Sequence, residues 1–181
     1  ILAVTFTNKA ANEMRERIRG MVSKESAKEM TVCTFHSLCV RILRKDIEKL
    51  GYKKNFTIYS SSDQVGLIRK LISRKSAKDE SLDHNLAISM ISRSKNKGVP
   101  VSNENDSLIS EIEKFYNKEL KHLNAVDFDD LLILAVQVLK ENVDVISFWR
   151  ERFRYITVDE FQDTNKKQME LVQLLSGSEQ N

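Results

Sequence analysis

The sequence has little proline, glycine or cysteine: one, five and two residues among 181. An all-β sandwich needs many tight turns, which depend on proline and glycine, so we expect a helix-rich protein. Two cysteines six positions apart, Cys33 and Cys39, make no disulfide framework, which predicts a reducing, cytoplasmic environment. No apolar run approaches the roughly 18 residues that cross a bilayer, which excludes a membrane protein.

Charge is distributed unevenly along the chain. Lys and Arg number 29 and Asp and Glu 26, so the formal net charge is only +3. Residues 1–100 carry 20 basic and 10 acidic side chains, whereas residues 101–181 carry 9 and 16. The excess of positive charge in the first part indicates a polyanionic partner.

Three short, nearly continuous apolar runs predict strands at residues 1–6, 30–35 and 155–158. Continuous rather than alternating runs are typical of parallel strands that are buried on both faces. A helical pattern follows each run, and Thr164 is a suitable N-cap for the last of these helices. Repeated strand-then-helix units predict an α/β fold with a parallel sheet.

The sequence changes character between about Gly51 and Asn124. It has no strong strand pattern there, and several amphipathic helical patterns lie in a polar, Lys- and Ser-rich background. Ser61 and Gln64 have the spacing of a capping box for one of these helices. We therefore predict three segments, an α/β part at residues 1–50, a helical insertion at 51–125, and a return to the α/β part at 126–181.

Polar clusters follow the three apolar runs, where the carboxyl ends of parallel strands gather ligands. After the third run stand two adjacent acids, Asp159 and Glu160. This is the Walker B pattern, in which the aspartate holds Mg²⁺ and the neighbouring acid activates a water molecule. The alternative interpretation is a solvated acidic helix start, since acids favour the helix N-terminus.

The other two clusters have the composition of a nucleic-acid contact. Phe6, Thr7 and Asn8 combine an aromatic ring that can stack on a base with polar groups at a helix start that can bind phosphate. The second cluster, at residues 34–37, repeats the Thr-Phe step with Thr34 and Phe35, and its His36 can likewise contact phosphate. The alternative is ordinary: a core phenylalanine and two helix caps.

Cys33, His36 and Cys39 also have the spacing C-x₂-H-x₂-C, which suits zinc. No fourth ligand stands nearby in the sequence, and Cys39 belongs to an apolar helical stripe. We therefore interpret both cysteines as buried structural residues rather than metal ligands.

Taken together, these segments resemble the UvrD/Rep/PcrA group of superfamily 1 DNA helicases. TFTNKAA at residues 5–11 is similar to motif Ia, TFHS at 34–37 to motif Ib, and DEFQDT at 159–164 to motif II, with VDFDDLL at 126–132 between them. The resemblance covers essentially the whole chain. It implies part of a RecA-like, P-loop NTPase domain, called 1A, that is split by a helical insertion called 1B. It also implies an ATP-dependent 3′–5′ DNA helicase of DNA repair or replication.

The resemblance further implies residue roles. Asp159 becomes the Mg²⁺-organising acid, Glu160 the general base for ATP hydrolysis, and Gln162 the link between the nucleotide and DNA sites. The residues on the motifs that line the single-stranded DNA track are Phe6, Thr7, Asn8, Thr34 and His36. The implied cofactors are ATP and Mg²⁺. The implied partners are single-stranded DNA, forked or tailed duplex DNA, and a second RecA-like domain of the same protein.

Part of that machinery is missing from the sequence. Nothing matches the phosphate-binding pattern G-x-x-x-x-G-K-S/T, and the family's later motifs do not follow. The chain opens at Ile1 inside an apolar run, so we interpret it as an internal fragment and expect no ATP hydrolysis or unwinding from it alone. Two alternatives stay open, a non-catalytic DNA-binding module and a nuclease-fused helicase relative of the AddA or RecB type.

Overall fold

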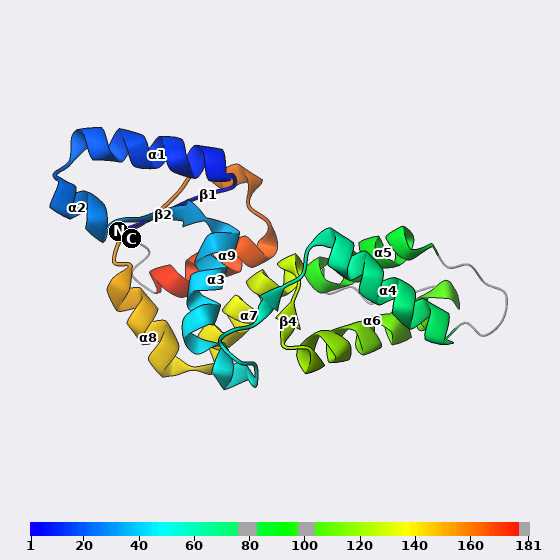
Figure 1. The fold of residues 1–181 in the computed structure, drawn as a ribbon. Coiled ribbons are helices and arrows are strands. Elements are labelled where there is room, and N and C mark those ends of the chain that lie inside the picture. Colours follow the sequence, from blue (N-terminus) through cyan, green and yellow to red (C-terminus); the bar gives the residue numbers. More distant parts are fainter. Residues whose placement is uncertain (76–82, 98–103, 178–181) are drawn as a thin grey trace. The chain divides into compact units, whose positions relative to one another are not determined.

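The computed structural model describes residues 1–75, 83–97 and 104–177 (Figure 1). The chain divides into two compact units, the first comprising Ile1–Lys54 and Leu132–Asn181 and the second Asn55–Leu131. That these units are the domains 1A and 1B of the resemblance stays a prediction.

The first unit is built on a parallel sheet with the strand order β2-β1-β5. Its strands are β1 (Leu2–Thr5), β2 (Thr31–Thr34) and β5 (Ile156–Val158), one within each predicted run. This confirms the α/β class. β1 and β2 are buried along their whole length, but β5 is not, and Thr157 is exposed. The expectation of burial on both faces is therefore wrong for β5, which pairs with β1 alone among the described residues.

Helices cover both faces of this sheet. Figure 1 shows α1 (Asn8–Met21) on one side and α3 (Phe35–Asp46) on the other. Arg15 ties α1 to the sheet, because its Nη2 donates a hydrogen bond to the Val32 carbonyl at 2.9 Å. The remaining elements of the unit are α2 (Lys24–Glu29), η1 (Ile47–Leu50), α8 (Val143–Arg152), η2 (Phe161–Asp163) and α9 (Lys166–Ser176).

The prediction that Thr164 caps the last helix is wrong by one position. The Thr164 hydroxyl donates instead to the Phe161 carbonyl at 2.8 Å and closes the η2 turn. Asn165 is the N-cap of α9, and it forms a reciprocal capping box with Gln168 at 2.9 Å in both directions. Two neighbouring residues were suitable caps, and the preceding turn engages the first of them.

The second unit is mainly helical. Helices α4 (Ser61–Lys75), α5 (His84–Lys97) and α6 (Glu104–His122) share a core that includes Ile68, Ile91 and Ile112. A parallel pair of two-residue strands, β3 (Thr57–Ile58) and β4 (Ala125–Val126), was not predicted, because runs this short carry no periodicity.

The cap of α4 also lies one residue before the predicted one. The Asp63 carboxylate accepts hydrogen bonds from the Ser60 amide at 2.9 Å and the Ser60 hydroxyl at 2.6 Å. The Asp63 amide donates back to Ser60 Oγ at 3.3 Å. The capping pair is therefore Ser60 and Asp63 rather than Ser61 and Gln64.

Helix α7 (Phe128–Glu141) is the segment in which the chain leaves the second unit and re-enters the first. It is rich in leucine and valine but spans only 14 residues and has charged residues at both ends. Among the described residues, no helix combines the length and apolar character needed to cross a membrane.

Candidate functional site

Thr5 and Asp159 meet at the carboxyl ends of β1 and β5, although 154 positions separate them in the sequence. Thr5 Oγ1 donates a hydrogen bond to Asp159 Oδ2 at 3.2 Å, and the Asp159 amide donates to the Val4 carbonyl at 2.9 Å. Thr5 is buried and Asp159 is half-buried. The carboxylate is therefore held through Oδ2, while Oδ1 has no hydrogen-bond partner within the described residues.

Glu160 and Gln162 lie directly beyond this point, in the turn that follows β5. Glu160 has a left-handed backbone with φ 47° and ψ 48°. Its carboxylate accepts a hydrogen bond from Gln162 Nε2, and both side chains are exposed. The structure thus places Asp159, Glu160 and Gln162 in one short segment, with the last two in direct contact.

Phe6, Thr7 and Asn8 lie where β1 leads into α1. The half-buried Phe6 ring packs against the Phe35 ring, with centroids 5.5 Å apart and planes tilted by 54°. Thr7 is the N-cap of α1, since its Oγ1 accepts from the Ala10 amide at 3.1 Å. Asn8 is the first residue of α1 and is exposed. The Phe6–Phe35 contact brings the first and second polar clusters together.

Thr34 and His36 have different environments. Thr34 is buried and is the N-cap of α3, with Oγ1 accepting from the Ser37 amide at 3.2 Å. The Thr34 and Ser37 hydroxyls are also 2.9 Å apart. His36 is exposed in the first turn of α3. Thr34 therefore shapes the start of the helix, and His36 presents its ring at the surface.

The two cysteines of the C-x₂-H-x₂-C pattern are both buried. Burial raises the pKa of the Cys33 thiol, and burial raises that of Cys39 to about 12. In residues 1–75, 83–97 and 104–177, no group of three or more His, Cys, Asp or Glu side chains is placed to hold a metal.

Sequence reasoning missed a buried ionic cluster in the second unit. Lys95 Nζ on α5 lies 2.8 Å from Asp127 Oδ2 and 2.7 Å from Asp130 Oδ1. Tyr116 on α6 donates its hydroxyl hydrogen bond to Asp127 Oδ2 at 3.0 Å. The two aspartates stand in the VDFDDLL segment, and nothing in the sequence pairs them with one lysine among 20 basic residues in the first hundred.

Burial and charge act against each other in this cluster. Burial lowers the pKa of the Lys95 ammonium, but the carboxylates of Asp130 and Asp127 outweigh it, so the pKa is raised above its usual value. Burial raises the pKa of Asp130, and the Lys95 charge offsets this only in part. The cluster therefore joins α5, α6 and the first turn of α7 through charges shielded from water.

The sequence is similar to known helicases over its whole length. A sequence profile of the UvrD/REP helicase N-terminal domain matches residues 1–181. The ATP-dependent DNA helicase PcrA of Leuconostoc citreum is 40% identical over 188 aligned positions, covering 100% of this chain and 25% of that protein. The proteins of the same name from Bacillus subtilis and Staphylococcus aureus are 36% and 35% identical, again over 100% of the chain and 25% and 26% of their own lengths. The chain thus spans about a quarter of the length of these relatives.

Proposed function

The chain belongs to the UvrD/REP helicase family, and we propose that it forms part of the ATP site and part of the single-stranded DNA track of an ATP-dependent DNA helicase. The observation that carries this proposal is the Thr5–Asp159 hydrogen bond. It fixes the first acid of DEFQDT at the carboxyl edge of a parallel sheet, where ligands bind in α/β proteins. In this proposal the sheet is part of a RecA-like domain 1A.

The residues at this edge fit a magnesium ion. Asp159 offers Oδ1, a hard oxygen ligand, while Thr5 holds the other carboxylate oxygen in place. In nucleotide sites Mg²⁺ takes one or two carboxylates and completes its shell with phosphate oxygens and water, so a larger cluster of acids is unnecessary. When bound, Mg²⁺ neutralises charge on the ATP phosphates.

Glu160 is the general base in this proposal. Its exposed carboxylate accepts the proton of the attacking water, and the hydrogen bond from Gln162 orients it. Gln162 is therefore a positioning residue, and we assign to it the coupling between DNA binding and the base. The direct contact between the two side chains supports this assignment.

Single-stranded DNA then crosses the ends of β1 and β2. The half-buried Phe6 ring stacks on a base, a contact that contributes about 1–3 kcal/mol. Asn8 and His36, both exposed, donate hydrogen bonds to phosphate or base edges. Thr7 and Thr34 cap the helices whose N-termini face the strand, and such termini favour phosphate.

The whole protein's activity needs parts that this sequence does not contain. It has no Walker A pattern, so we propose that the chain alone neither hydrolyses ATP nor unwinds DNA. In the parent, a second RecA-like domain completes the ATP site and drives 3′–5′ translocation. Forked or tailed duplex DNA is its substrate, repair or replication its role, and the cytoplasm its location.

The test is ATP hydrolysis by the parent protein with and without single-stranded DNA. Glu160→Gln lowers DNA-stimulated turnover by a factor of about 10² or more, as expected for loss of a general base, and leaves DNA affinity unchanged. Glu151→Gln is the matched control, because Glu151 is an exposed glutamate of the same unit, on α8. We expect the ATP turnover of this variant to stay at the wild-type level.

Three outcomes contradict the proposal in different ways. Turnover that survives Glu160→Gln removes the base assignment. DNA binding with no turnover in any variant identifies a non-catalytic DNA-binding module. Degradation of the DNA strand by the wild-type parent indicates a nuclease-fused relative.

A further inference from the structure

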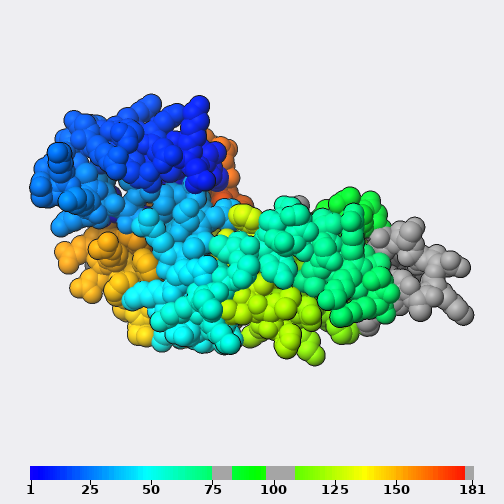
Figure 2. All heavy atoms as spheres, in the orientation of Figure 1, coloured from blue at the N-terminus to red at the C-terminus, as the bar shows by residue number. Residues whose placement is uncertain are grey.

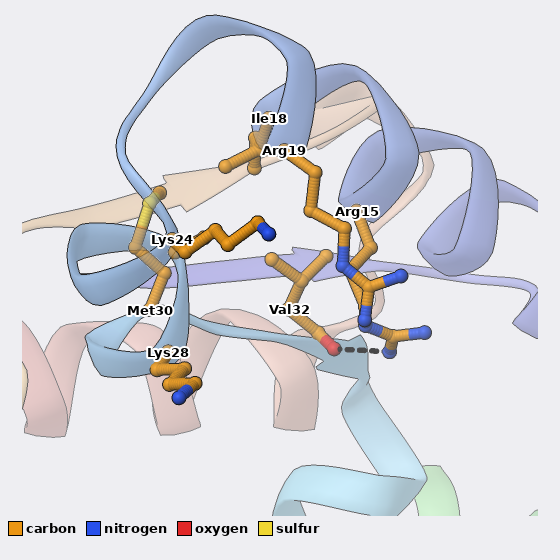
Figure 3. Close-up of a pocket in the computed structure, with 8 residues that line it drawn as sticks. Arg15, Ile18, Arg19, Lys24, Lys28, Met30 and Val32 are labelled. Carbon is orange, nitrogen blue, oxygen red and sulfur yellow. Dashed lines mark hydrogen bonds between the residues drawn. The ribbon is translucent and has the colours of Figure 1, made fainter.

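A basic pocket lies between α1, α2 and the start of β2, with a volume of about 380 Å³. Figure 3 shows its lining, with Arg15 and Arg19 coming from α1 and Lys24 and Lys28 from α2. Figure 2 shows the atoms of these two helices, in blue, at the surface. No acidic residue is among the described residues that line the pocket. We call this cavity the α1–α2 pocket.

Both arginines have partners within the protein, but only Arg15 is held firmly. Arg15 donates to Asn12 Oδ1 at 2.6 Å and to the Val32 carbonyl at 2.9 Å, so its guanidinium is fixed at one wall. Arg19 forms an ion pair with Glu16 at 2.8 Å, but both side chains are more than half exposed. An exposed pair of this kind contributes little and exchanges readily for another anion.

The two lysines of the pocket differ from the arginines in their contacts. Neither Lys24 nor Lys28 has a hydrogen-bond or ion-pair partner within the residues that the structure describes. Figure 3 shows the Lys24 side chain reaching across the pocket toward Val32. Ammonium groups that border a cavity and lack a counter-charge attract an anionic ligand.

The floor of the pocket is apolar. It is formed by Ile18, Ala27, Met30 and Val32. The flexible thioether of Met30 suits side chains of different shape. A ligand that matches both the basic walls and the apolar floor therefore carries negative charge around an apolar group. The pocket has room for one or two side chains of such a ligand.

We propose that the α1–α2 pocket binds a short acidic segment of a partner protein, in which carboxylates flank one aliphatic or aromatic side chain. A nucleic-acid strand matches the charge but not the floor. Single-stranded DNA sites use aromatic side chains on which bases stack, and no aromatic residue is among the described residues that line the pocket. Carboxylates pair with the four cations, while the apolar side chain enters between Met30 and Val32.

This pocket lies away from the proposed DNA track. Thr34 is the last residue of β2 and His36 lies just beyond it, whereas Met30 precedes the first residue of the strand. Arg15 and Arg19 are in the second half of α1, a helix about 20 Å long whose first residue, Asn8, is at the track. Binding of the acidic segment is therefore compatible with simultaneous binding of DNA.

The experiment is a peptide selection against the parent protein. A phage library of random peptides, about twelve residues long, is selected on immobilised wild-type protein in the presence of excess oligo-dT, which occupies the DNA track. We expect the surviving peptides to share acidic residues around a Leu, Met or Phe. A synthetic survivor then binds Lys24→Glu/Lys28→Glu about tenfold more weakly than wild type, since two attractions become repulsions.

Two further variants keep the result interpretable. Arg17→Glu/Arg154→Glu reverses two exposed charges of the same unit outside the pocket, and we expect wild-type peptide affinity. Lys24→Gln/Lys28→Gln removes charge without reversing it, and a smaller loss in the same direction is expected even if the reversal variant fails to fold.

Other outcomes overturn the proposal. If the selected peptides lack acidic residues, or if a selected peptide binds the wild-type protein and both lysine variants equally well, the α1–α2 pocket is not a site for an acidic segment. A loss of oligo-dT affinity and a shallower salt dependence in Lys24→Gln/Lys28→Gln, with no peptide bound, identify a phosphate-backbone contact instead. Unchanged DNA-stimulated ATP hydrolysis in these variants separates this result from a failure of the proposed helicase function.

Discussion

Replacing Lys95 by methionine tests whether the buried ionic cluster stabilises the second unit. Methionine keeps most of the length of the side chain and removes the ammonium group, with its charge and its hydrogen bonds to Asp127 and Asp130. The Lys95, Asp127 and Asp130 side chains are 5%, 3% and 15% exposed, so the two carboxylates lose their cation in a place that water scarcely reaches. Breaking a buried pair from one side costs about 3–5 kcal/mol.

Hydrogen exchange measures this loss locally. An opening free energy lower by 3–5 kcal/mol makes the amides of α5, α6 and the first turn of α7 exchange faster by about two to three and a half orders of magnitude. Amides of β1 and β2, in the other unit, keep their wild-type rates. Mass spectrometry of the parent protein at about pH 7.5 resolves both sets.

The loss also depends on pH. In the wild type the pKa of Asp130 is already raised by burial, so the folded state binds extra protons and stability falls as pH rises through the window above the unfolded pKa of about 3.9. Lys95→Met removes the cation that opposes this shift. The difference from wild type is therefore largest at neutral pH and shrinks toward about pH 5.

The Lys49–Asp144 pair is the matched control. Its N–O distance is also 2.8 Å, but the side chains are 38% and 71% exposed. Lys49→Met therefore costs at most about 1 kcal/mol. Two results would refute the reasoning: Lys95→Met changes hydrogen exchange no more than Lys49→Met does, or its effect is independent of pH. Either one would show that burial does not increase the free-energy cost of removing the cation.

Three further predictions concern the first unit. Thr5→Val removes the hydrogen bond to Asp159 and lowers kcat for ATP in the parent about tenfold, as expected for a bond to a charged group, whereas an unchanged kcat would show that the bond does not position the carboxylate. Phe6→Ala weakens single-stranded DNA binding by about 1–3 kcal/mol without changing DNA-independent ATP hydrolysis, and Phe6→Leu, which keeps packing but not the aromatic face, weakens it similarly. Cys33 and Cys39 do not react with a thiol reagent in the folded protein at about pH 8, because burial keeps them protonated; rapid labelling without unfolding would contradict their burial.

The strands of the first unit could be predicted because burial leaves a direct record in the sequence. Each apolar run contains a strand, with one or two end residues outside it. Helix caps were harder to predict than strands. In each case two adjacent residues, Ser60 and Ser61 or Thr164 and Asn165, have nearly equal capping ability. The turn geometry before each helix selects between them, and sequence patterns do not contain it.

The pairings that build the candidate site were beyond sequence reasoning. Thr5 and Asp159 are 154 positions apart, and only the parallel pairing of β1 with β5 shows that their side chains meet. Nothing in the sequence distinguishes the buried Lys95 from the many lysines that lie at the surface. Local patterns identify which residues are chemically capable, and the fold determines which of them share a site.

The backbone at Glu160 links conformation to the proposed chemistry. Two non-glycine residues in the described ranges have positive φ, Asn124 at 50° and Glu160 at 47°. Asparagine adopts this region readily, but glutamate does so at a cost of roughly 1–2 kcal/mol. A strained residue persists where the surrounding structure over-determines it, and such residues cluster at active sites. Here β5 ends beside Thr5, the chain turns at Glu160, and η2 returns Gln162 to its carboxylate. The strained backbone is therefore that of Glu160, the residue that we assign as the base. The same turn places the Glu160 carboxylate directly beyond Asp159.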